Sequence, residues 1–123
     1  MAKTKSQERE QRIQMEIVVD ANGPEEVAMG WYYYLDEVIQ FPFTATCNGQ
    51  RATSPFEQGD EIEVTALADL DECMHEVFVM TRLDTKRQLA IPLAQLTPIS
   101  TTDLATKQAV GDWHYWVKQG YEF

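Results

Sequence analysis

The chain has 123 residues, which is about the size of one domain with a buried core. Its 20 acidic residues outnumber its 10 basic ones and leave a formal charge of −10, so nucleic acids and anionic membranes are disfavoured as partners. Cations and basic protein surfaces are favoured instead. The 44% hydrophobic content, with three Trp, five Tyr and five Phe, predicts a packed globule and excludes a disordered chain.

The N-terminal residues carry charge and no apolar run, so we expect neither a signal peptide nor a membrane-spanning segment. These features predict a cytoplasmic monomer. Cys47 and Cys73 are far apart in sequence, and in that compartment they are expected to be free thiols.

A first helix is predicted after an N-cap at Ser6 or Thr4. Its apolar stripe consists of Ile13, Ile17 and Val18. The sequence Asn22-Gly23-Pro24 should end this helix, with Gly23 in the left-handed conformation and Pro24 opening the next helix.

The second helix should carry Glu25 and Glu26 in its first turn, where carboxylates oppose the positive end of the helix dipole. One of its faces is apolar at helical spacing: Ala28, Trp31, Leu35 and Val38. Tyr32 and Tyr33 flank that face, and the aromatic cluster is more typical of a core than of a ligand site.

Side chains that alternate along the chain between the two faces of a strand predict strands over residues 41–47 and 61–68. A long loop over 48–58 separates them. In the second strand, Ile62, Val64 and Ala66 should face the core, while Glu61, Glu63 and Thr65 face outward. A hairpin over 75–91 and a helical turn over 92–96 should lead to a short strand over 97–99.

A third helix, capped by Thr102 or Asp103, completes the chain. Its expected apolar face comprises Leu104, Ala105, Ala109, Trp113, Trp116 and Val117. The predicted fold is α+β in a single domain: two N-terminal helices (1–40), a small SH3-like antiparallel β-barrel (41–100) and a C-terminal helix (101–123) packed outside. The barrel rests on analogy of pattern alone.

Two acidic clusters interrupt this pattern. Asp36 and Glu37 lie where the second helix gives way to the first strand, and Asp69, Asp71 and Glu72 follow the second strand. If the two strands pair as a hairpin, the clusters meet. Carboxylate oxygens are the ligands that Ca²⁺ prefers, and a divalent cation relieves the repulsion between them. These five residues are the predicted metal ligands, although a solvated acidic turn would have the same sequence.

Other sites fit the sequence less well. Twelve residues counted from Asp69 end at Met80, where an EF-hand needs glutamate, and the central glycine is absent. Zinc would have to combine Cys73 and His75 with the distant Cys47 and His114, without paired ligand spacing. No catalytic triad, phosphate loop or nucleophile motif is present, so no enzymatic activity is expected.

The segments that include Trp31-Tyr32-Tyr33-Tyr34-Leu35 and Phe41-Pro42-Phe43 make the chain resemble the bacterial CcbP-type calcium-binding proteins. The resemblance also covers residues 10–13 and 16–21 and runs more loosely through 59–64 and 71–83. It implies a small acidic protein that binds Ca²⁺ without an EF-hand, as a buffer or a sensor. It carries over to Asp36 or Glu37 and to the sequence Asp71-Glu72-Cys73, without saying which oxygens are ligands.

A different class of function remains open. Exposed aromatic residues and the outward face of Glu61 and Glu63 could make the chain an acidic, SH3-like interaction module that binds a basic protein partner without metal.

Overall fold

Three helices and five strands make up the computed structural model, which describes residues 6–48, 56–121 and 123. The first half contains α1 (Gln7–Arg12), the π-helical segment η1 (Ile13–Ile17), α2 (Pro24–Val38), β1 (Phe43–Cys47) and β2 (Glu61–Leu67). The second half contains the one-turn helix η2 (Leu70–Cys73), β3 (Phe78–Arg82), β4 (Gln88–Pro92), η3 (Leu93–Gln95), β5 (Leu96–Pro98) and α3 (Leu104–Lys118). The α+β class is as predicted. The predicted 48–58 loop lies mostly outside the described residues.

The five strands form one antiparallel sheet in the order β4-β3-β2-β1-β5. The predicted hairpin of the first two strands is present, with Phe43 opposite Val64 and Ala45 opposite Ile62. The closed SH3-like barrel is wrong for the described residues, because β4 and β5 occupy opposite edges and do not pair. Among the described strands, the three-residue β5 pairs with β1 alone and lies at the edge of the sheet.

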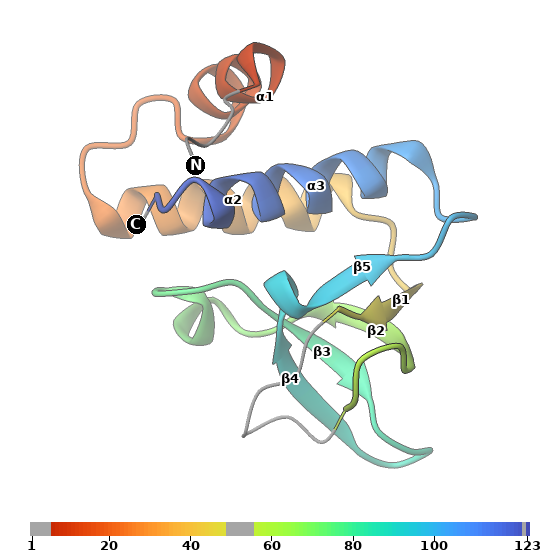
Figure 1. Ribbon diagram of the computed structural model, residues 1–123. Helices are drawn as coiled ribbons and strands as arrows, with labels where there is room; N and C mark the ends of the chain where they lie inside the picture. Colours follow the sequence, from red (N-terminus) through yellow and green to blue (C-terminus); the bar gives the residue numbers. More distant parts are fainter. Residues whose placement is uncertain (1–5, 49–55, 122) are drawn as a thin grey trace.

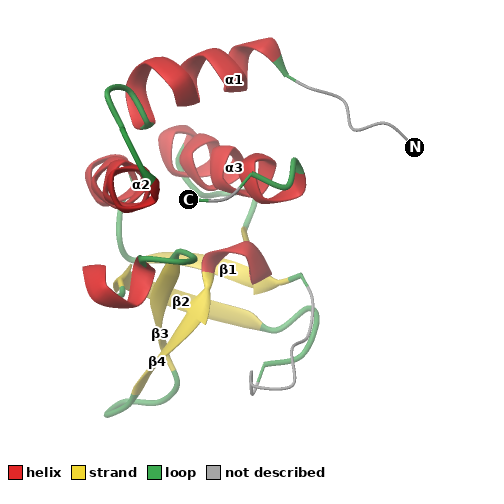
Figure 2. Ribbon diagram, turned by 90° about the vertical axis from the view of Figure 1, so that its left-hand side faces the viewer, coloured by secondary structure: helices red, strands yellow, loops and turns green. Residues whose placement is uncertain are grey.

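The helices lie in two layers above one face of the sheet (Figures 1 and 2). α2 and α3 run side by side directly over the sheet, and α1 covers them from the far side. The C-terminal helix α3 packs on the outside of the sheet and against α2, in the middle layer, and α1 is the outermost element. Within the described residues, no helix is both long and apolar enough to cross a bilayer.

The corner between α1 and α2 uses different residues from those predicted. Asp20, with φ of 64°, takes the left-handed conformation, whereas Gly23 is extended with φ of 178°. Aspartate tolerates the left-handed region better than most residues, so the chain turns before it reaches the glycine. Pro24 does open α2, as expected.

The core fills the space between the sheet and the α2–α3 layer. Trp31 and Leu35 of α2 are fully buried there, as the helical spacing predicts. Ile62 and Val64 face it from β2, but Ala66 is exposed and Leu67 is buried in its place. The pairing of β2 with β3 shifts between Val64 and Ala66, and such an irregularity reverses which side chains face inward.

The buried face of α3 is also rotated from the predicted one. Trp113 and Trp116 are buried, but three expected core residues are exposed: Leu104, Ala105 and Val117. Two polar residues, Thr106 and Asp112, are fully buried instead. The spacing of apolar residues could not predict that Thr106 and Asp112 are buried, because each of them makes polar contacts inside the fold.

Asp112 joins all three helices. Its Oδ1 accepts hydrogen bonds from Arg9 Nη1 at 2.6 Å and Arg12 Nη2 at 2.7 Å, and its Oδ2 accepts one from Arg12 Nε at 2.7 Å. The Tyr34 hydroxyl of α2 donates to the same carboxylate at 3.3 Å. Burial, and then the charge of Asp112, raise the pKa of Tyr34 to about 12. The outer helix is therefore attached to the middle layer by a buried, charge-assisted cluster.

His114, two residues further along α3, makes the fold sensitive to acid. Its Nε2 lies 2.8 Å from the Leu96 carbonyl oxygen, and burial lowers its pKa below the ordinary value of 6.5. The unfolded chain therefore takes up this proton first. The stability that depends on a neutral His114 is fully present above about pH 6.5. It is lost as the pH falls toward the lowered pKa that His114 has in the folded state.

We expect the free energy of unfolding to fall between about pH 7 and pH 5, and His114→Gln to reduce that fall. Urea unfolding at the two pH values checks this. His75 is exposed, so His75→Gln serves as the control and should leave the pH dependence as it was. A His114→Gln protein with an unchanged pH dependence would contradict the assignment.

Candidate metal centre

The two acidic clusters occupy the ends of α2 and β2. Asp36 and Glu37 lie in the last turn of α2, where the free carbonyl groups of the helix add negative potential. Asp69 immediately precedes η2, and Asp71 and Glu72 lie within it. All five carboxylate side chains are exposed.

Tyr32 connects these two regions. Its hydroxyl donates a 2.9 Å hydrogen bond to the carbonyl oxygen of Ala68, the residue just before Asp69. Burial raises the pKa of Tyr32, and the neighbouring Cys73, Asp36 and Asp69 raise it further. Asp36 and Asp69 therefore lie near the same phenol group. The strand pairing and the Tyr32 hydrogen bond thus bring α2 beside the turn that follows β2.

The buried thiol of Cys73 contacts the backbone on both sides of the acidic turn. Cys73 is fully buried, and its Sγ lies 3.9 Å from the Ala68 carbonyl oxygen and 3.5 Å from that of Phe78. Burial raises the pKa of this thiol, so it stays protonated and can act as a weak donor. The backbone at Ala68 is therefore fixed by Tyr32 on one side and by Cys73 on the other.

The donor chemistry fits a hard cation such as Ca²⁺, since every side chain of the predicted set offers carboxylate oxygens. The side chains themselves are not gathered into a cage. Among the described residues, no group of three or more Asp, Glu, His or Cys side chains is placed to hold one metal ion. Because the carboxylates are exposed, no packing prevents them from turning toward an ion, at the cost of their rotamer entropy. Backbone carbonyl groups and water would complete the six to eight ligands that calcium takes.

The residues considered for zinc are not brought together into such a group either. Cys47 and Cys73 are both buried thiols that are not joined by a disulfide, and the His114 ring faces the Leu96 carbonyl. Asp112 and His114 do face different partners, as their spacing on a helix predicts.

The outward face of β2 is partly neutralised. Glu63 accepts a 2.7 Å hydrogen bond from Arg82 Nε on the adjacent strand, and Glu61 is exposed. This face therefore presents less free negative charge than the alternation of its residues suggests.

Sequence reasoning missed the role of Tyr32. It placed this residue beside the apolar face of the helix, where an aromatic side chain is most simply explained as core packing. Its position four residues before Asp36, one helical turn away, is the signal that could have linked it to the acidic cluster.

Comparison with known proteins agrees with this geometry. The model of the CcbP family, described as calcium binding, matches residues 11–117. The chain belongs to the CcbP calcium-binding family. Its fold is similar to the crystal structure of Anabaena CcbP, with 36% sequence identity, a TM-score of 0.86 and complete coverage of both chains.

A second similar structure is that of a calcium-binding protein in its calcium-binding form. It is 35% identical, with a TM-score of 0.83 over 97% of this chain and 96% of the other. No protein of curated function matches the sequence significantly. The resemblance seen in the sequence is thus confirmed over nearly the whole chain.

Proposed function

We propose that this CcbP-family protein binds Ca²⁺ at the junction between the end of α2 and η2, through carboxylates among Asp36, Glu37, Asp69, Asp71 and Glu72. Membership of a calcium-binding family supports Ca²⁺ as the ion, and the two acidic clusters support this position for it. The observation that carries the placement is the hydrogen bond from Tyr32 to Ala68, which ties the two acidic regions together.

The two acidic clusters should be stabilised by a cation that lies between them. Exposed acids on two separate elements repel one another when no cation is present, and an ion that bridges them removes this repulsion. In the cell, such a protein would act as a calcium buffer, or as a sensor if bridging shifts η2 relative to α2. The metal-free interaction module has less support, because the pairing of Glu63 with Arg82 satisfies part of the acidic face that it requires.

We expect Ca²⁺ to raise the melting temperature, because a ligand that binds only the folded state stabilises it by mass action. At a free concentration a hundred times Kd, the gain is about 2.7 kcal/mol. Thermal melts with Ca²⁺, Mg²⁺ or chelator check this. The Mg²⁺ melt is the control for general charge screening, because Mg²⁺ demands tight octahedral geometry and should stabilise less. Melting temperatures that coincide in Ca²⁺ and in chelator would reject the proposed function.

A further inference from the structure

The turn that follows β2, which carries three of the five predicted calcium ligands, is held together by its own hydrogen bonds. The Glu72 amide donates to the Asp69 carbonyl oxygen at 2.9 Å and closes η2. At the base of the turn, the Ala68 amide donates to the Phe78 carbonyl oxygen at 3.0 Å, and the Phe78 amide donates to Cys73 Sγ at 3.5 Å. Because its two ends are joined in this way, η2 should move as one unit.

Among the described residues, one side-chain hydrogen bond joins this turn to α2. The Tyr32 hydroxyl donates it to the Ala68 carbonyl oxygen at 2.9 Å, and Asp36 lies one helical turn after Tyr32 on α2. Ala68 is only 1% exposed, and Cys73 Sγ, at 3.9 Å from the same oxygen, is a weak donor. Without the phenol hydroxyl, this buried carbonyl group would have to move toward water to regain a full hydrogen bond.

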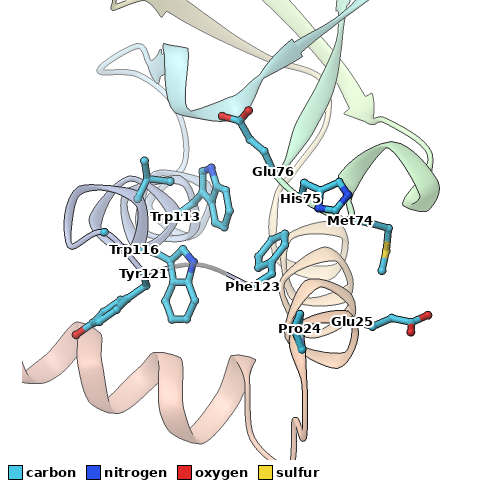
Figure 3. A pocket seen from close by; sticks show the side chains of 11 residues that line it. Pro24, Glu25, Met74, His75, Glu76, Trp113, Trp116, Tyr121 and Phe123 are labelled. Carbon is cyan, nitrogen blue, oxygen red and sulfur yellow. The ribbon is translucent and has the colours of Figure 1, made fainter.

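A cavity lies beside the segment that follows η2. Its volume is about 710 Å³, and its lining includes Met74, His75 and Glu76 after the turn and Pro24 and Glu25 at the start of α2. Figure 3 shows Met74 and His75 above Pro24 and Glu25. On this side the turn therefore has room to shift relative to α2.

We propose that Tyr32 is a positioning residue of the calcium site, whose hydroxyl holds the acidic turn at the distance from α2 that a bridging Ca²⁺ requires. This inference rests on the proposed function. Positioning of this kind raises affinity, because the ion does not have to order the turn when it binds. It also favours Ca²⁺ over Mg²⁺, since Mg²⁺ keeps several waters and is held by one or two carboxylates, which a single element can supply.

Tyr32→Phe tests this role, because it removes the hydroxyl and keeps the ring. In part of the folded molecules the turn should then leave its place, and the apparent calcium affinity falls in proportion to the fraction that keeps it. By isothermal titration, we expect about tenfold weaker binding of Ca²⁺ and less than about threefold weaker binding of Mg²⁺. A residue that only supported the fold would leave both affinities of the folded protein unchanged.

Tyr33→Phe is the matched control. Tyr33 is the next residue of α2, is 55% exposed, and its ring meets that of Tyr32 edge-on at 5.7 Å. This variant loses the same atom and should bind both ions as the unchanged protein does. A second check adds Tyr32→Phe to a protein with Asp36→Asn and Asp69→Asn. The bridge is already lost there, so the remaining calcium affinity should change less than about twofold.

Circular dichroism at the titration temperature checks that each variant is folded. Equal calcium affinities of Tyr32→Phe and the unchanged protein would overturn this inference and leave the proposed function standing. Equal losses for Ca²⁺ and Mg²⁺, or for Tyr32→Phe and Tyr33→Phe, would also overturn it, because they indicate a general effect on α2. If the unchanged protein bound no calcium, the proposed function and this inference would both fail.

Discussion

Replacing Asp112 with asparagine should lower the free energy of unfolding by about 3 kcal/mol. The carboxylate is fully buried, and the side chains of Arg9 and Arg12 are only 34% and 13% exposed. Removing its charge leaves the Arg9 guanidinium without its buried counter-charge and leaves Arg12 with only the exposed Glu8 at 3.5 Å, and the new amide N–H groups face both arginines. For a domain of this size, the loss corresponds to a fall of roughly 10 °C in melting temperature.

The control for this prediction is Asp84→Asn, which breaks the exposed pair between Asp84 and Arg87. Exposed pairs contribute little because water and salt screen them, so this variant should melt with the unchanged protein. Urea unfolding of both variants provides the comparison. If Asp112→Asn were as harmless as Asp84→Asn, the buried cluster would not be what holds α1 on the fold.

The same cluster shows why the order of the helices in space could not be read from the sequence. Arg9 and Arg12 resemble surface residues of an ordinary charged helix, and Asp112 lies a hundred residues later on a helix whose apolar residues already seem to define its buried face. Only the three-dimensional arrangement shows that one carboxylate meets both arginines and Tyr34. Spacing along one helix predicts which apolar residues pack, but it says nothing of polar contacts between distant segments.

The strands were predictable to a similar degree. Alternation predicted the burial of Phe43, Ala45, Ile62 and Val64 correctly, although β1 begins at Phe43 and not at residue 41 as predicted. It failed after Val64, because the shift in pairing with β3 depends on the partner strand and not on β2 alone. The open sheet was missed for the same kind of reason, since whether the edge strands β4 and β5 meet depends on how the whole sheet is arranged and not on the residues of either strand.

The position of the candidate site was the most predictable feature, because it follows from chain direction. Two antiparallel strands necessarily bring the residues before the first beside the residues after the second, and Tyr32 does contact Ala68. The orientation of the five carboxylates did not follow, since exposed side chains are fixed by their ligands and by solvent. Their assignment as ligands stays a prediction.

Neutralising Asp36 and Asp69 together should remove tight calcium binding. These two acids belong to separate elements and both raise the pKa of Tyr32, so Asp36→Asn with Asp69→Asn takes one charge from each side of the proposed bridge. Without both carboxylates, an ion keeps ligands from one element at most, and we expect calcium affinity to fall at least about tenfold. The metal-free double variant should be slightly more stable than the unchanged protein, because the repulsion between the clusters is reduced.

Glu16→Gln with Glu61→Gln is the matched control. It removes the same formal charge from two exposed positions, one in η1 and one on β2, away from the proposed site. Isothermal titration with calcium should give nearly unchanged affinity for this control. Equal losses in the two double variants would mean that calcium responds only to the net charge of −10 and has no defined site. Full binding by the Asp36/Asp69 variant would place the ion elsewhere on the molecule. Loss confined to that variant, together with its higher metal-free stability, is the combination that only a bridge between α2 and η2 produces.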